Sequence, residues 1–236
     1  MSHFVSHPDV WRDNKEVNFI MKTEKIRRLV GVAILAAIVV VLQSVGSFIR
    51  FGSVSVSLVL IPIVVGAAMY GPGAGAILGG VFSVVVLLQP DTAFFYGIHF
   101  FGTVLTVLAK GILAGLLSGL TFKAVAHKNL WFAVLLAAMV CPVVNTGLFA
   151  LGSRLFFWSV YAEMGNGNAM TILMTVMIGF NFIAEFAANM ICAPVIVRIL
   201  HAVKIHYYQL HEIPAASAAG IFIMQWYFRD SKHSLG

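Results

Sequence analysis

Residues 29–48 read LVGVAILAAIVVVLQSVGSF, a run of 20 residues with no charged side chain. As an α-helix, a run of this length covers about 30 Å, which is the thickness of the hydrocarbon core of a bilayer. Lys22, Lys25, Arg27 and Arg28 come shortly before it. Because Lys and Arg concentrate on the cytoplasmic side of membrane proteins, we predict a transmembrane helix that enters the membrane from the cytoplasm.

Five further apolar segments follow the first. Gly71-Pro72 separates the second from the third, and Pro90-Asp91-Thr92 ends the third, before an aromatic segment that leads into the fourth. Such residues interrupt helices. Between the first two segments, residues 49–56 (IRFGSVSV) alternate apolar with polar or small residues, which favours a short extended loop outside the membrane. The predicted spans are residues 29–48, 57–70, 74–89, 101–122, 131–157 and 171–200.

The distribution of basic residues orients these six spans. Eight Lys and Arg residues fall on the predicted inner side, against two, Arg50 and Arg154, on the outer side. We therefore predict an all-α membrane protein, a bundle of six transmembrane helices with both termini cytoplasmic, which crosses the cell membrane several times. The inner residues are Lys22, Lys25, Arg27, Arg28, Lys123, Lys128, Arg198 and Lys204.

The amino-acid composition argues against a sizeable soluble domain. Of the 236 residues, 60% are hydrophobic and 10% charged, whereas soluble domains are about 45–50% apolar and about 25% charged. We expect a polar N-terminal extension at residues 1–21 and one membrane domain that binds substrate at residues 22–206. The C-terminal tail, residues 207–236, carries an apolar patch too short to span the membrane, so we expect it to be interfacial or disordered.

Several function classes are disfavoured. The net charge of +6 reflects topology and contact with anionic lipid rather than nucleic-acid binding, because the basic residues flank apolar runs. Cys141 and Cys192 lie within apolar runs and not at the spacing of metal ligands. The sequence has no phosphate loop of the form Gly-x-x-x-x-Gly-Lys-Ser/Thr and no nucleophile in a recognisable setting. We expect a protein that is not an enzyme and that binds no metal.

Three predicted spans carry polar residues at a similar depth within the membrane. Ionisable groups there cost a few kcal/mol unless they are paired or face a cavity, so they indicate functional sites. Lys110 and Glu185 either form a structural ion pair that fixes the helix register or take part in ligand binding. His99 is interpreted as an interfacial residue rather than a metal ligand. On the fourth span, His99, Thr103, Thr106 and Lys110 follow the spacing i, i+4, i+7 and i+11, which places them on one stripe of the helix. The other polar residues are Asn145 and Thr146 on the fifth span, and Asn181, Glu185 and Asn189 on the sixth.

Small residues recur at helical spacing on three spans. Ala33 and Ala37 are four residues apart on the first, Gly75 and Gly79 on the third, and Gly111, Gly115 and Gly119 follow the same spacing on the fourth. Such faces let two helix backbones approach closely in lipid. They serve either packing within this chain or the binding of a separate membrane partner.

Three segments carry a resemblance to a known family. They are KIRRLVGVAILAA at residues 25–37, SLVLIPIVVG at residues 57–66 and YGPGAGA at residues 70–76. They resemble the basic start of the first helix and the junction of the second and third helices in the substrate-binding S components of energy-coupling factor (ECF) vitamin transporters. The resemblance covers roughly residues 22–205, and the junction is its most specific part.

The resemblance implies a six-helix bundle that binds a vitamin or its precursor in a pocket on the outer side, with the loop around Arg50 as its lid. Family members work with a membrane scaffold subunit and two ATPase subunits. By this likeness Ala33 and Ala37 face the scaffold. The chain itself is expected to bind no cofactor, since the partner subunits use the ATP.

The sequence indicates the family more specifically than it indicates the substrate. FGTVLTVLAKG at residues 101–111 and PVVNTG at residues 142–147 look most like the pantothenate branch. A buried cation suits a carboxylate, but equally suits folate or another anion. The alternative is a non-transport membrane scaffold or sensor whose polar residues only join helices. The candidate substrate-binding residues are Arg50, His99, Thr103, Lys110, Asn145, Thr146, Asn181 and Glu185.

Overall fold

The computed structural model describes residues 9–46, 50–51, 54–55, 58–164, 168–173 and 179–211, together with most of the side chains between residues 25 and 202 in these ranges. The chain divides into two compact units, Met1–Pro194 and Val195–Gly236. The helix contacts and cavities described below lie in the first unit.

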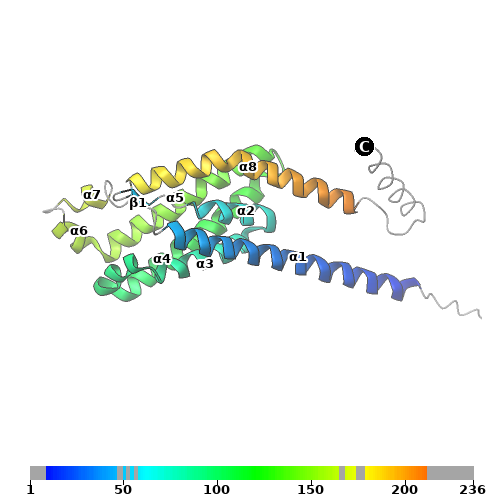
Figure 1. Ribbon diagram of the computed structural model, residues 1–236, viewed down its shortest axis with the longest axis horizontal. Helices are drawn as coiled ribbons and strands as arrows, with labels where there is room; N and C mark the ends of the chain where they lie inside the picture. Colours follow the sequence, from blue (N-terminus) through cyan, green and yellow to red (C-terminus); the bar gives the residue numbers. More distant parts are fainter. Residues whose placement is uncertain are drawn as a thin grey trace, which may run out of the picture. The chain divides into compact units, whose positions relative to one another are not determined.

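The described residues are almost entirely helical (Figure 1). The helices are α1 (Asp9–Gly46), α2 (Leu60–Tyr70), α3 (Pro72–Leu87), α4 (Pro90–Val125), α5 (Leu130–Phe156), α6 (Trp158–Met164), α7 (Ala169–Ile172) and α8 (Phe180–His211). Strands β1 (Arg50–Phe51) and β2 (Val54–Ser55) form an antiparallel pair with Arg50 opposite Ser55. This short hairpin falls where the sequence predicts an extended loop.

The apolar segments are confirmed as helices, but they differ in length. Among the described residues, four helical segments are long and apolar enough to cross a membrane: Lys25–Gly46, Thr92–Val125, Leu130–Phe156 and Phe182–Ala202. Helices α2 and α3 have 11 and 16 residues, or about 16 and 24 Å, which is less than the hydrocarbon thickness. The chain is therefore a helical membrane protein, while the count of six spans and the orientation of its termini stay predictions.

Two helices extend beyond the predicted domain boundaries. Helix α1 begins at Asp9, within the predicted N-terminal extension, because no Gly or Pro interrupts the chain between Asp9 and Val30. Helix α8 continues to His211, past the predicted end of the membrane domain at residue 206. The prediction for the rest of the tail falls on residues 212–236, which lie outside the described residues.

Helix α4 begins at Pro90, eleven residues before the predicted span, because Pro fits the first turn of a helix. Its backbone departs from helical geometry at His99, where φ is −153° and ψ is 91°. The Nδ1 atom of His99 accepts a hydrogen bond from the backbone N–H of Gly102 at 2.9 Å. The His99 side chain thereby caps the helical segment that follows the break, which is the longer of the two segments of α4.

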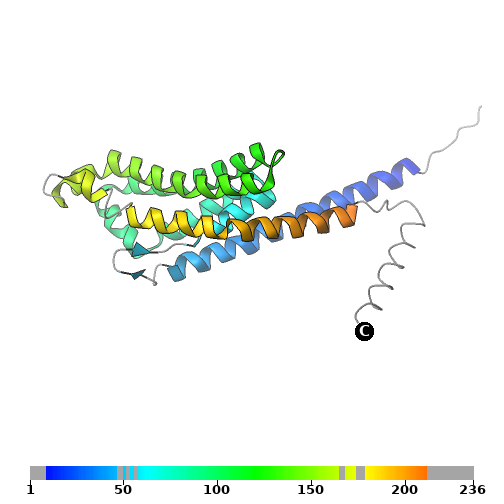
Figure 2. The same ribbon diagram turned by 90° about the horizontal axis from the view of Figure 1, so that it is seen from above.

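Glycines bring α3 and α4 together. A Cβ atom on Gly79 would clash with the backbone carbonyl of Gly111, and one on Gly75 would meet the carbonyl oxygen of Gly115. Ser83 Oγ also donates to the carbonyl of Val107 at 2.7 Å across the same contact. For these two faces the structure confirms packing within the chain. Helices α3, α4 and α5 run side by side in both views (Figures 1 and 2).

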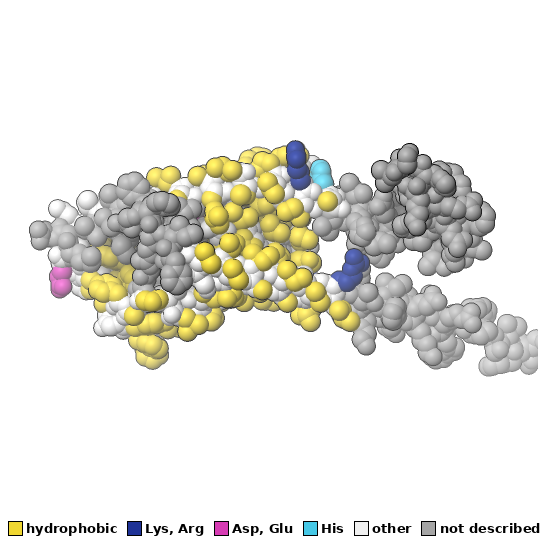
Figure 3. Space-filling view, in the orientation of Figure 1, with side chains coloured by type: hydrophobic (Ala, Val, Ile, Leu, Met, Phe, Trp, Pro, Cys, Tyr) yellow, Lys and Arg dark blue, Asp and Glu magenta, His cyan; other side chains and the backbone are white. Residues whose placement is uncertain are grey.

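Helix α1 packs against α2 and α3 but buries little of its surface. The Arg28 guanidinium donates a hydrogen bond to the carbonyl of Tyr70, the last residue of α2. Near the other end of α1, Gln43 is hydrogen-bonded to Gln89. Hydrophobic side chains cover most of the described surface on the face shown in Figure 3, as expected for contact with lipid.

Candidate functional site

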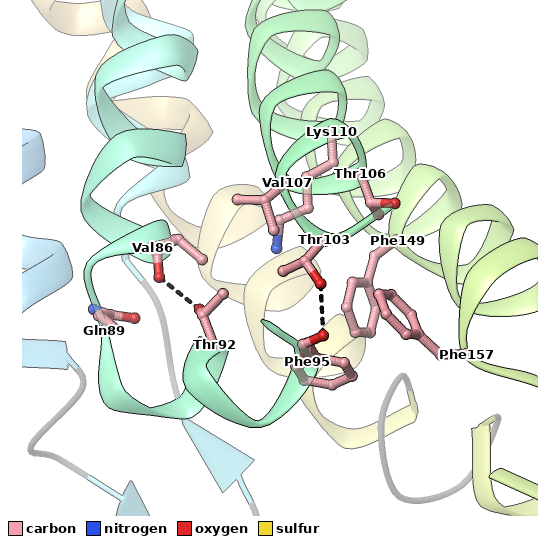
Figure 4. Close-up of a pocket in the computed structure, with 10 residues that line it drawn as sticks. All are labelled: Val86, Gln89, Thr92, Phe95, Thr103, Thr106, Val107, Lys110, Phe149 and Phe157. Atoms are coloured by element: carbon pink, nitrogen blue, oxygen red, sulfur yellow. Dashed lines mark hydrogen bonds between the residues drawn. The ribbon is translucent and has the colours of Figure 1, made fainter. Parts of the chain in front are cut away.

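A cavity of about 150 Å³ lies between α3, α4 and α5. Aromatic and aliphatic side chains form most of its wall, and a few polar groups converge on it, as is typical of small-molecule sites. Pockets for drug-sized ligands commonly measure about 300–1,000 Å³, so this cavity is smaller than a typical small-molecule site. The lining residues are Val86, Gln89, Thr92, Phe95, Thr103, Thr106, Val107, Lys110, Phe149 and Phe157 (Figure 4).

Among the described residues that line the cavity, Lys110 alone carries a charge. Figure 4 shows its ammonium group pointing into the space that the labelled side chains enclose. The Nζ atom lies 5.1 Å from the centre of the Phe149 ring and 5.7 Å from that of Phe82. These cation–π contacts compensate part of the cost of placing the charge there.

The Lys110 ammonium has three N–H donors. In the described part of the chain, no side chain or carbonyl accepts a hydrogen bond from it, and no carboxylate forms an ion pair with it. Its donors are therefore available to a ligand with anionic or strongly accepting atoms.

Two threonines that line the cavity are fixed by the backbone. Thr103 Oγ1 lies 2.9 Å from the carbonyl oxygens of both Phe95 and His99, so it bridges the two halves of α4 across the break. Thr92 Oγ1 donates to the carbonyl of Val86 at 2.6 Å. Each hydroxyl has a single proton, which it already donates within the protein. These two oxygens can therefore only accept hydrogen bonds from a ligand.

Aromatic rings close the end of the cavity near the start of α4. The Phe95 ring lies edge-on to Phe157 at 5.1 Å and to Phe149 at 6.3 Å between ring centres. Phe157 also belongs to a buried cluster with Tyr161, which is 1% exposed, and with residues of the α7 region. The short helices α6 and α7 thus support a wall of the cavity.

The chain matches the family described as ECF transporter, substrate-specific component, over residues 27–197. The match runs from α1 into α8 and includes every residue that lines the cavity. The chain belongs to this family. No curated protein and no solved structure matches it.

An ECF S component is a subunit of a transporter rather than a catalytic enzyme. Family membership implies uptake of a vitamin-type substrate in association with scaffold and ATPase subunits. It favours the transport prediction over the alternative of a free-standing scaffold or sensor. It also places the protein in a membrane, in agreement with its long apolar helices.

The predicted substrate-binding residues of this S component divide into three groups. Thr103 and Lys110 line the cavity. The side chains of Arg50 and Asn181 lie outside the described residues. His99, Asn145, Thr146 and Glu185 are described, but they are not among the residues that line this cavity, and their part in binding stays a prediction.

His99 is displaced from the stripe that its spacing predicts. The break in α4 removes it from the helical register of Thr103, Thr106 and Lys110, and its side chain is exposed. Its ring instead packs against Phe156, with 5.2 Å between ring centres. The prediction of one continuous stripe of four residues is wrong at this position.

A separate polar cluster joins α5 and α8 in the S component. Asn145 Nδ2 donates to Glu185 Oε2 at 3.4 Å, and Asn189 Nδ2 donates to the backbone carbonyl of Glu185 at 2.9 Å. The Oδ1 atoms of both asparagines are buried and have no described hydrogen-bond partner. No direct ion pair between Lys110 and Glu185 is present among the described contacts. Glu185 lies close enough to act electrostatically on Lys110.

Several cavity residues escaped the sequence-based site prediction. Gln89 lies beside Pro90 at the end of an apolar run, and this polar amide next to an apolar run was the signal that could have revealed it. Phe149 and Phe157 had no such signal, whereas Phe95 belongs to the aromatic segment before the predicted fourth span, which we expect to contribute to the pocket. Aromatic residues near helix ends are common as interfacial side chains, so their types do not reveal that they surround one cavity.

Proposed function

We propose that this S component binds a small organic anion, with pantothenate as the first candidate, and that the Lys110 ammonium binds its carboxylate. The observation that carries the proposal is a lysine directed into a mainly apolar cavity without a hydrogen-bonded partner in the described part of the chain. A carboxylate would accept charge-assisted hydrogen bonds from Lys110, while the aromatic wall would cover the carbon skeleton.

The polar cluster of Asn145, Glu185 and Asn189 supports a second part of the same proposal. Its two amide oxygens have no described hydrogen-bond partner, and its carboxylate accepts a hydrogen bond from Asn145 at 3.4 Å, so acceptors outnumber donors in the cluster. Hydroxyl or amide N–H groups of a substrate would supply further donors. Pantothenate carries a carboxylate, an amide and two hydroxyls, and so matches both parts.

The proposal is tested by equilibrium binding of radiolabelled pantothenate to the full chain purified in a mild detergent. Pantothenol, which has an alcohol in place of the carboxylate, is the matched competitor. We expect pantothenol to compete at least about 30-fold less well, since losing a charged hydrogen-bond partner costs about 2 kcal/mol. Equal competition by both compounds would contradict the proposal that Lys110 binds the carboxylate. If neither binds, native mass spectrometry of the gently purified protein identifies the retained molecule.

We also propose that Ala33 and Ala37 contact the scaffold subunit. Both are exposed on α1, so this small-residue face is not covered by other helices among the described residues. Large apolar side chains beside it are exposed too, with Ile34 at 57% and Val41 at 58%. The face therefore remains available for close approach of another helix in the membrane.

A further inference from the structure

A second hollow, of about 270 Å³, lies between the start of α5 and the part of α8 that ends at Pro194. We call it the α5–α8 groove. Its walls are Trp131, Phe132 and Leu135 on one side and Met190, Ala193 and Pro194 on the other. These side chains are apolar, and Trp131 and Phe132 are each 54% exposed. The groove is separate from the cavity at Lys110.

The groove begins at the end of a helix and continues along it. Asn129, which also lines the groove, is the N-cap of α5, and its side chain accepts a hydrogen bond from the backbone N–H of Phe132 at 3.2 Å. Leu135 lies six residues after Asn129, which corresponds to about 9 Å along an α-helix. Because Trp favours the membrane interface, we expect the groove to run from headgroup level at Trp131 into the hydrocarbon.

Basic residues precede the groove in the chain. Lys123, His127 and Lys128 come before Asn129, the first residue that lines it, and all three are exposed. The sequence contains no Asp or Glu between Asp91 and Glu163, so neither α5 nor the loop before it supplies a counter-charge. Within the described residues, no carboxylate pairs with either lysine. An anion from outside the chain is therefore the natural partner of this end of the groove.

We propose that the α5–α8 groove binds an acyl chain of an anionic phospholipid whose headgroup lies against Lys123 and Lys128. An apolar chain fits walls that offer almost no hydrogen-bonding side chain, and a phosphate at headgroup depth is attracted by the lysines. A polypeptide segment fits less well. Its backbone N–H and C=O groups would lose water in the groove and find few partners there.

The test is native mass spectrometry of the full chain, delipidated in detergent and then mixed with phosphatidylglycerol or phosphatidylcholine of identical acyl chains. We expect the wild type to retain phosphatidylglycerol about 25-fold better at low ionic strength, since each lysine near an anionic headgroup contributes roughly fivefold. The double variant Lys123→Gln/Lys128→Gln should lose this preference. Arg154→Gln, which removes a cation at the opposite end of α5, is the matched control and should keep it.

Two further variants test the place of binding. Ala193→Trp fills the groove and should reduce retention of both lipids. In the second variant, p-benzoylphenylalanine replaces Leu135, and irradiation in native membranes should add the mass of a phospholipid. Equal retention of the two lipids by the wild type, an unchanged preference in the double lysine variant, or crosslinking of position 135 to a polypeptide would each overturn the proposal.

Discussion

Gln43 of α1 and Gln89, the N-cap residue of α4, are joined by two hydrogen bonds. Gln43 Nε2 donates to Gln89 Oε1 at 3.1 Å, and Gln89 Nε2 donates to the backbone carbonyl of Gln43 at 3.1 Å. Gln89 also lines the cavity at Lys110. The contact therefore connects the cavity to the helix that carries Ala33 and Ala37.

This connection gives a prediction for Gln43, which does not itself line the cavity. Gln43→Leu should lower the affinity for the bound anion about fivefold, since Gln89 loses a partner worth about 1 kcal/mol and is held less firmly at the cavity. Equilibrium binding to the purified chain measures the change. Ser44→Ala, at the neighbouring exposed position, is the control and should bind normally. An unchanged affinity in Gln43→Leu would show that the contact between Gln43 and Gln89 holds α1 in place but does not influence ligand binding.

Lys110→Met removes the charge from the cavity while keeping a side chain of similar length. We expect the affinity for pantothenate to fall by about 30-fold or more, the cost of a lost charged hydrogen-bond partner, with little change in thermal stability. Binding and thermal unfolding in the same detergent give both quantities. If Lys110→Met instead destabilises the ligand-free protein and Glu185→Gln restores its stability, the two residues form a structural pair and the carboxylate binds elsewhere.

The contact between α3 and α4 depends on residues without side chains. Gly79→Leu should lower the midpoint of thermal unfolding, because its side chain would be forced against the backbone of Gly111. Overpacking of this kind costs about 1–3 kcal/mol. Gly73→Ala in the same helix is the matched control, because nothing lies within 4 Å of the Cβ that it would add. Similar unfolding of the two variants would argue against close approach of these helices.

The two alanines on α1 test the proposed partner. Ala33→Leu and Ala37→Leu should abolish uptake into cells, because the added side chains would hold the scaffold helix away. Ligand binding by the isolated variants should remain close to normal, since neither alanine touches the cavity. Val45→Leu, also exposed on α1, serves as the control. Loss of binding together with normal assembly would place these alanines in the internal packing of the protein.

The sequence predicts the helices better than it predicts the cavity, for physical reasons. The apolar runs that become α1, α4 and α5 are long because they must cover the hydrocarbon, and Gly71-Pro72 marks the turn between α2 and α3 because φ at Gly71 is 89°. The break at His99 has no comparable signal, since its capping contact with Gly102 appears only after folding.

The composition of the cavity depends on contacts between distant parts of the chain. Lys110 was recognisable because a charge within an apolar run is costly. Phe157 reaches the cavity because α5 ends at Phe156 and the chain then turns into α6, where Phe157 packs against Phe95. Helical spacing places residues on a face of one helix, but it gives no distance between residues on different helices.

The turn between α2 and α3 distinguishes six spans from four. These two helices are short enough to form a hairpin that enters the membrane and returns to the same side. The hydrogen bond from Arg28 to the Tyr70 carbonyl instead favours six spans, because it holds the turn at the level of the basic residues that precede the first span. The turn should then reach the cytoplasm.

Cysteine labelling in a background with Cys141 and Cys192 replaced by Ser tests this prediction. Gly73→Cys is suitable because the position is exposed and an added Cβ meets nothing within 4 Å. We expect a membrane-impermeant maleimide to label it in inside-out vesicles and not in intact cells, whereas Asn168→Cys, which lies between the predicted fifth and sixth spans and is exposed, should label only from outside. Protection of Gly73→Cys from both sides would indicate the hairpin and four spans. Labelling of Gly73→Cys in intact cells would mean that the orientation is inverted, because Arg28 would then lie on the outer side.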